Sequence, residues 1–164
     1  MSRILVLVLA VVVAFGATAP SLAQPDTLEK IKSTGVLTIG TRTGSPPFAY
    51  VNKNNEWVGF SIDLVDQLVK PSIEKAVGRQ IKIEKKESTP PTRIPLLTSN
   101  AVDLIAGTMT DTPQRRESVD FSLTFFYTGA QFLVKKGSPI HGISDVGGKR
   151  VAAQQGATNA KILR

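Results

Sequence analysis

The chain has 164 residues, 20 lysines and arginines against 13 aspartates and glutamates, and a formal net charge of +7. Hydrophobic residues make up 41% and charged residues 20%, which is typical of a folded globular protein. The absence of cysteine excludes a disulfide scaffold, a zinc–thiolate site and a thiol nucleophile within this chain, and the single histidine, His141, excludes a multi-histidine metal site. We expect no metal and no cofactor. The basic residues are dispersed among acidic ones, so no nucleic-acid partner is expected either.

The N-terminus has the layout of a secretory signal. Arg3 supplies a positive start, residues 4–15 form an unbroken apolar run, and Ser21-Leu22-Ala23 provides a small-residue cleavage site. An apolar run of this length rises only about 18 Å as a helix, against a hydrocarbon core of about 30 Å, which argues against a membrane anchor. We therefore predict a signal peptide over residues 1–23 and a soluble, periplasmic mature protein.

Helices and strands are predicted to alternate along the rest of the chain. Asp26 and Gly35 bound a first helix, residues 36–40 form a buried strand, and the prolines of residues 41–47 make that stretch a loop. Further along, we expect a short hairpin over 48–59, helices over 61–77, 90–100, 114–118 and 143–146, strands over 81–84, 102–106 and 150–153, extended segments over 121–126 and 131–135, and a final helix capped by Thr158. This alternation predicts an α/β sheet built from βαβ units.

Two loops follow the carboxyl ends of predicted strands, residues 41–47 and 107–112, where ligands bind in such sheets. Arg42 lies in the first loop and Arg115 just after the second, near a helix N-terminus that favours anions. An arginine can bind a carboxylate through two parallel hydrogen bonds. The sequence shows no nucleophile–base pair, phosphate-binding Gly-Lys-Ser/Thr loop or paired catalytic carboxylates. The residues favour a binder of a small anion over an enzyme.

Six short stretches then carry a resemblance to one protein family. They are Pro-Pro-Phe at 46–48, Val-Gly-Phe-Ser-Ile-Asp-Leu at 58–64, Val-Asp-Leu-Ile-Ala-Gly-Thr-Met-Thr at 102–110, Thr-Pro-Gln-Arg-Arg at 112–116, Val-Asp-Phe-Ser at 119–122, and Gly-Gly-Lys-Arg-Val to Gln-Gly-Ala-Thr at 147–158. In this order and spacing they resemble the family 3 solute-binding proteins of polar amino-acid ABC transporters. The resemblance implies a type II periplasmic-binding-protein-like α/β fold, in which two lobes joined by a hinge close on one amino acid.

The resemblance also implies how the chain is divided. Residues 24–132 correspond to lobe one, and residues 133–164 to the hinge strand and the start of lobe two. Members of the family are longer, so lobe two is expected to be truncated after Arg164. The acidic residue that holds the α-amino group of the ligand in the family would lie beyond that point. Residues 24–164 alone are therefore expected to bind an amino acid weakly.

Individual positions carry family roles with them. Arg115 falls on the arginine that binds the ligand α-carboxylate, Thr108 and Thr110 on hydroxyl and backbone contacts, and Thr158 on a second-lobe contact. Phe60 falls on an aromatic residue that packs against the ligand. The expected ligand-binding residues are Arg42, Phe60, Arg93, Gly107, Thr108, Thr110, Arg115 and Thr158.

Two departures from the common pattern resemble the glutamate/aspartate-binding subgroup. Arg42 and Ser45 stand where many members carry an acidic residue and an aromatic one, and Ser61 stands where an acid is common. In that subgroup the arginines at the positions of Arg42 and Arg93 serve the acidic ligand. The implied function is that of a monomeric amino-acid-binding component that delivers its ligand to an inner-membrane ABC permease. A periplasmic cyclohexadienyl dehydratase-like enzyme on the same fold stays open as the alternative, and it would need a general acid in the cleft.

The signal-peptide prediction has a direct test. Because the apolar run is short and ends before Ser21-Leu22-Ala23, the exported protein should begin at Gln24. N-terminal sequencing of the secreted protein would check this, and an intact Met1 would contradict it.

Overall fold

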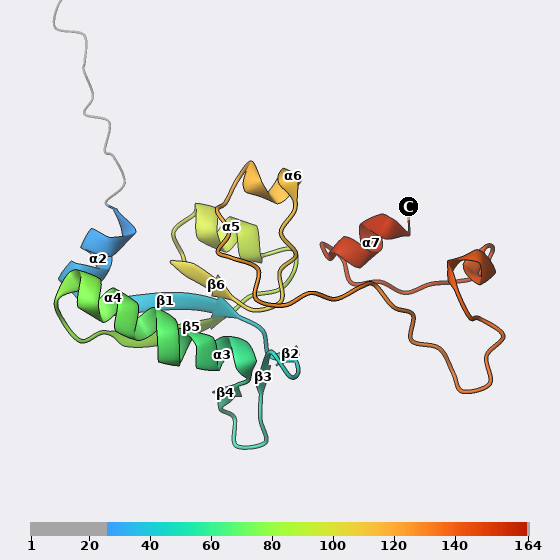
Figure 1. The fold of residues 1–164 in the computed structure, drawn as a ribbon, viewed down its shortest axis with the longest axis horizontal. Helices are drawn as coiled ribbons and strands as arrows, with labels where there is room; N and C mark the ends of the chain where they lie inside the picture. Colours follow the sequence, from blue (N-terminus) through green and yellow to red (C-terminus); the bar gives the residue numbers. More distant parts are fainter. Residues whose placement is uncertain (1–25, 164) are drawn as a thin grey trace, which may run out of the picture.

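The computed structural model describes residues 26–163. Its centre is a parallel three-stranded sheet in the order β5-β1-β6, made of β1 (Val36–Thr41), β5 (Lys82–Glu87) and β6 (Leu104–Ala106). Each connection between these strands contains a helix, as parallel pairing requires (Figure 1). The predicted α/β sheet of βαβ units is confirmed. The signal peptide predicted for residues 1–23 lies outside the described residues and stays a prediction.

One face of the sheet is covered by α2 (Thr27–Thr34) and by a continuous helical run of α3 (Phe60–Leu64), the π-helical turn η1 (Val65–Val69) and α4 (Lys70–Val77). Alternate residues of β1 point to this face and are fully buried there. The core they build consists of Ile31, Leu37, Ile39, Ile62, Val65, Val77, Ile81 and Ala106. This apolar layer fixes β1, and with it the loop that leaves the end of β1.

Both ends of α2 follow from local chemistry. The Asp26 side chain accepts a hydrogen bond from the backbone N–H of Leu28 at 3.2 Å, and Gly35 ends the helix in the left-handed region with φ of 72°. The predicted helix bounds are confirmed. Pro71 was expected inside the second helix, and it lies within the continuous run, at the point where the π-helical turn η1 passes into α4.

The other strands and helices that precede residue 117 are short. The predicted hairpin forms as β3 (Ala49–Val51) and β4 (Trp57–Val58), and it gains a third strand, β2 (Gly44–Ser45), from the stretch that we expected to be only a loop. Gly44 and Ser45 can pair because they precede Pro46, the first residue of that stretch without an N–H. On the other side of the sheet lie α5 (Arg93–Thr98), shorter than expected, and α6 (Pro113–Arg116) (Figure 1).

After α6 the described residues contain only η2 (Ile143–Val146), a 3-10 turn, and α7 (Thr158–Ile162). The strand predicted over 150–153 is wrong, and the segments expected to be extended over 121–126 and 131–135 pair with no strand. A strand needs a neighbour to accept its backbone hydrogen bonds, and none is present beside these residues within 26–163. Thr158 is the first residue of α7 and Ala157 its cap, which corrects the predicted capping role of Thr158.

No helix within residues 26–163 is long and apolar enough to cross a membrane.

The entry to β6 is tied to β1 by one buried carboxylate. Asp103 accepts hydrogen bonds from Lys30 Nζ at 2.7 Å and from the backbone N–H of Thr38 at 2.9 Å. Its side chain is almost fully buried, so the ion pair with Lys30 is held in a shielded environment. This contact fixes where β6 begins beside β1. As a result, the loops that follow Thr41 and Ala106 leave the sheet at the same edge.

The central position of Ile39 makes a stability prediction. Ile39 is 0% exposed, so Ile39→Val should lower the free energy of unfolding by about 0.5–1.5 kcal/mol through the lost methylene and the cavity it leaves. The same change at Ile143, which is 62% exposed, should stay within about 0.5 kcal/mol. Urea denaturation of the two variants would check this, and equal effects would show that β1 is not the core of the folded chain.

Candidate functional site

Three arginines come together beyond the carboxyl edge of the sheet. Arg42 follows β1, Arg93 begins α5 and Arg115 lies in α6. Burial, followed by the positive charges of Arg115 and Arg42, lowers the pKa of Arg93 to about 10. The guanidinium groups of Arg115 and Arg42 are therefore close enough to repel that of Arg93. The sequence predicted all three as ligand residues, and the structure brings them to one place.

The loop between β6 and α6 holds this arginine cluster through its backbone. The Thr108 carbonyl oxygen accepts a hydrogen bond from Arg93 Nη1 at 2.6 Å, and the Thr110 carbonyl oxygen accepts one from Arg115 Nη1 at 2.6 Å. A Cβ placed on Gly107 would lie 3.5 Å from Arg42 Cγ, so the loop also lies against the third arginine. Predicted residues of the 107–110 stretch thus position the arginines, while the side chains of Thr108 and Thr110 stay exposed.

The charge of the cluster is not neutralised by the protein. Arg93 is only 6% exposed, and its Nε is buried with no hydrogen-bond partner, as is Nη1 of Arg42. The partners that the arginines do have within residues 26–163 are carbonyl, hydroxyl and amide oxygens, none of them a carboxylate. A buried guanidinium group without an anion, such as that of Arg93 beside two half-buried ones, is energetically costly, so this arrangement favours binding of a small anion.

Arg115 owes its place to the start of α6. The Thr112 side chain caps the helix by accepting a hydrogen bond from the backbone N–H of Arg115 at 3.3 Å, and Pro113 occupies the first turn. Burial lowers the pKa of Arg115. The neighbouring Arg116 instead faces away from the cluster, forming an ion pair with Asp111 and lying over the ring of Phe121. Of these two adjacent arginines, only Arg115 is available to a ligand at the cluster.

Aromatic rings gather near the hairpin and the start of α3. Phe60 is 42% exposed, and its ring centroid lies 6.2 Å from that of Phe48 and 5.8 Å from that of Phe125. Phe126 adds an edge-to-face contact with Phe48 at 4.8 Å. Phe60 was predicted as a ligand contact, whereas the part played by Phe125 and Phe126 was missed, because nothing in the local pattern indicates that an irregular segment returns to the hairpin.

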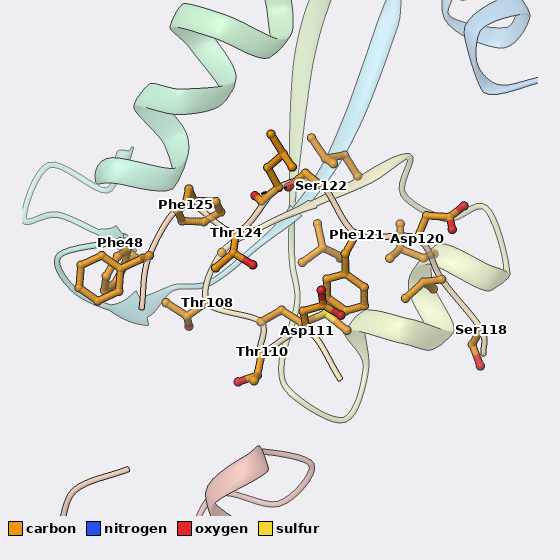
Figure 2. A pocket seen from close by; sticks show the side chains of 18 of the residues that line it. Phe48, Thr108, Thr110, Asp111, Ser118, Asp120, Phe121, Ser122, Thr124 and Phe125 are labelled. Atoms are coloured by element: carbon orange, nitrogen blue, oxygen red, sulfur yellow. Dashed lines mark hydrogen bonds between the residues drawn. The ribbon is translucent and has the colours of Figure 1, made fainter. Parts of the chain in front are cut away.

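A hollow of about 630 Å³ opens beside β6 and the 107–111 loop, enclosed by residues 118–128. Figure 2 shows Thr108, Thr110 and Asp111 along its lower rim, with Phe48 and Phe125 on one side and Phe121 inside. Three aspartates, 103, 111 and 120, line it together with many apolar residues, and no lysine or arginine does. Asp103 and Asp111 are paired with Lys30 and Arg116, but no basic side chain lines the hollow, so it offers an anion no cationic partner. The arginine cluster is therefore the candidate site, and the predicted residues Gly107, Thr108 and Thr110 border both the cluster and the hollow.

The last predicted residue, Thr158, comes from the C-terminal segment (residues 133–163). Two residues before it, the carbonyl oxygen of Gly156 accepts a hydrogen bond from Arg115 Nη2 at 3.2 Å. Gln154 Oε1 accepts one from Arg42 Nη2 at 3.4 Å. The structure therefore brings this stretch to the cluster, but the contacts run through Gln154 and Gly156. Both were missed as site residues, although Gly156 lies in the Gln-Gly-Ala-Thr stretch that carried the resemblance.

The parallel sheet with its connecting helices is that of the type II periplasmic binding proteins. The chain belongs to the bacterial extracellular solute-binding proteins, family 3, whose family model matches residues 37–162. The fold class predicted from the sequence is confirmed. A solved structure of an ancestral arginine-binding protein bound to glutamine matches with a TM-score of 0.69 at 36% identity, covering 79% of this chain and 55% of that one.

Curated relatives agree on the class of ligand and differ on the ligand. A glutamine-binding protein of Geobacillus stearothermophilus is 41% identical over 144 residues, covering 87% of this chain and 53% of the relative. An L-glutamate/L-aspartate-binding protein of Pseudomonas aeruginosa is 34% identical over 156 residues, covering 93% of this chain and 52% of the relative. The chain thus spans about half the length of these relatives.

The uncompensated charge of Arg93 leads to a prediction about thermal stability. Arg93→Met keeps much of the side-chain volume and removes a buried cation that repels Arg42 and Arg115. We expect the melting temperature of the chain without ligand to be unchanged or raised, because replacing buried charge by apolar volume is often neutral or stabilising. Thermal unfolding followed by circular dichroism would check this. The exposed Arg150→Met is the control for charge removal alone, and a clear loss of stability confined to Arg93→Met would contradict the prediction.

Proposed function

We propose that the chain is part of the amino-acid-binding component of an ABC importer, which acts outside the cytoplasm and passes its ligand to a membrane permease. Membership of family 3 and the binding proteins among its relatives support this. In the proposed organisation residues 24–132 form lobe one, and residues 133–164 form the hinge strand and the start of lobe two. The protein would act in the periplasm as a monomer after removal of residues 1–23.

The proposed ligand is an acidic amino acid, glutamate or aspartate. The observation that carries this is the arginine cluster, in which Arg42, Arg93 and Arg115 lie together with no carboxylate partner within the described residues. One α-carboxylate on Arg115 would leave Arg42 and Arg93 without compensation. A second carboxylate on the ligand side chain would supply the missing anion and form charge-assisted hydrogen bonds with both.

The other predicted residues complete the proposed site. Phe60 would pack its exposed ring against the carbon chain of the ligand, and the exposed hydroxyls of Thr108 and Thr110 would bind its polar groups. Gly107 lies against Arg42 without adding a side chain that would fill the space. Thr158 would contact the ligand from the side opposite the sheet.

The dehydratase-like alternative is not favoured. A dehydratase on this fold would need a general acid close to the bound substrate. The arginines of the cluster donate hydrogen bonds to carbonyl, hydroxyl and amide oxygens, and none of these acceptors within the described residues is a carboxyl group that could act as the acid. The relatives named above are binding proteins. Binding without chemistry is the simpler proposal for this set of residues.

The proposed ligand can be tested by NMR chemical-shift titration of the chain with glutamate, aspartate and glutamine. Glutamate and glutamine have nearly the same shape, so their comparison isolates the side-chain charge. We expect glutamate to bind at least about tenfold more tightly, since a neutral amide would leave buried guanidinium charge unmatched. Equal affinity for glutamine would contradict the acidic-ligand proposal. Absence of binding to any amino acid would contradict amino-acid binding by this chain.

Adjacent arginines provide a matched pair of variants for the same titration. Arg115→Ala should weaken glutamate binding at least about tenfold, since a hydrogen bond to a charged group is worth about 1.5–3 kcal/mol. Arg116→Ala also removes one positive charge from the same helix, but this arginine is paired with Asp111 and lies outside the cluster. It should therefore leave the affinity for glutamate nearly unchanged. If the two variants behaved alike, the cluster geometry would not be what binds the ligand.

A further inference from the structure

The stretch from Gln154 to Lys161 reaches back to the sheet side of the molecule. Two of its contacts, from Gln154 Oε1 and from the Gly156 carbonyl oxygen, are made to arginines of the candidate site. A third joins the Lys161 ammonium to the Gln114 side chain on α6. Figure 1 shows α7 to the right of α5 and α6, beyond the end of the sheet.

Gly156 permits this approach. Its backbone has φ of 74°, in the left-handed region that favours glycine. A Cβ at this position would lie 2.9 Å from the backbone nitrogen of Pro91 and 3.0 Å from the carbonyl carbon of Pro90. Any other residue would push the stretch away from the backbone that precedes α5. The close approach therefore places Gln154 within reach of Arg42.

The donors of Arg42 are only partly used. Nε donates to Ser45 Oγ at 3.2 Å, Nη2 donates to Gln154 Oε1 at 3.4 Å, and Nη1 is buried without a partner. Both acceptors are neutral, so they orient the guanidinium group without cancelling its charge. The Gln154 contact is long for a hydrogen bond to a cation, and an anion would compete with it effectively.

We infer that Gln154 is a positioning and specificity-determining residue of the amino-acid site. Its amide oxygen orients Arg42 by accepting a hydrogen bond from Nη2, while leaving the positive charge for an anionic ligand. This inference rests on the proposed function for its ligand, but the Gln154–Arg42 contact itself does not. A carboxylate at position 154 would act as an internal competitor, because it would pair with Arg42 and neutralise it.

The first experiment compares Gln154→Glu with Gln155→Glu in the chain. The two variants add the same charge at adjacent, exposed positions, but the Gln155 side chain makes no hydrogen bond within the described residues. By NMR titration we expect Gln154→Glu to weaken glutamate binding about tenfold or more relative to Gln155→Glu, and to change glutamine binding much less. A loss of glutamate-over-glutamine preference is a result that a purely structural role would not produce. Equal glutamate affinity in the two variants would overturn the inference.

A second experiment needs no ligand. The chain has no cysteine, so the pair Gln114→Cys and Lys161→Cys, whose native side chains touch, can be joined selectively by a short bifunctional thiol reagent. Cross-linking should be faster with Gln154→Glu than with Gln155→Glu, because an ion pair with Arg42 holds the stretch against the sheet side. The difference should vanish when Arg42→Met is added, as a double-mutant cycle requires for a direct interaction.

The two experiments separate the two ideas. If the unmodified chain binds no amino acid while the cross-linking difference depends on Arg42, the proposed function fails and the Gln154–Arg42 contact stands. If glutamate binds but Gln154→Glu and Gln155→Glu behave alike in both experiments, the role of Gln154 is overturned and the proposed function stands. Gln154→Asn, which keeps the amide group, should retain more of the glutamate preference than Gln154→Ala.

Discussion

The structure depends on holding three guanidinium groups together without a carboxylate among them. Desolvation of Arg93, followed by its repulsion by Arg115 and Arg42, acts against this arrangement, and both effects lower the pKa of Arg93. It is stabilised by the loop after β6, whose carbonyl groups at Thr108 and Thr110 bind Arg93 and Arg115. That loop is in turn held by the parallel pairing of β1 and β6 and by the buried Asp103. The sheet thus fixes the carbonyl groups of Thr108 and Thr110, whose hydrogen bonds to Arg93 and Arg115 offset the repulsion between the arginines.

Much of this could be predicted from the sequence, because the relevant signals are local. The caps Asp26 and Gly35, the apolar strand of residues 36–40 and the loop that follows Ala106 are each encoded within a few neighbouring residues. A parallel α/β sheet then brings the ends of its strands to one edge, so arginines in or after those loops meet without any further information. The fold and the arginine cluster were accessible for this reason, and the family resemblance pointed the same way.

What could not be predicted depends on contacts between segments far apart in the chain. Gln154 meets Arg42 across more than a hundred residues, and Phe125 and Phe126 return to the hairpin from a stretch without regular structure. The strand expected at 150–153 had the right residue types but no neighbouring strand within the described residues. Strand propensity reflects fit to a sheet more than an intrinsic backbone preference, so the residue types alone could not decide the outcome.

The groups that accept hydrogen bonds from the arginine cluster carry no charge, and this matters for the kind of ligand that the cluster could select. A carboxylate on Arg42 or Arg115 would orient them more strongly, but it would also cancel the charge that attracts an anion. Carbonyl, hydroxyl and amide oxygens orient the guanidinium groups and leave that charge available. An anion bound to the cluster would offset part of the energetic cost of holding the three guanidinium groups together. Gln154 and Gly156 contact two of these arginines from the C-terminal segment, so in the proposed site the ligand and that segment would act on the same arginines. Recognition of ligand charge and the approach of the segment would then be coupled through Arg42 and Arg115.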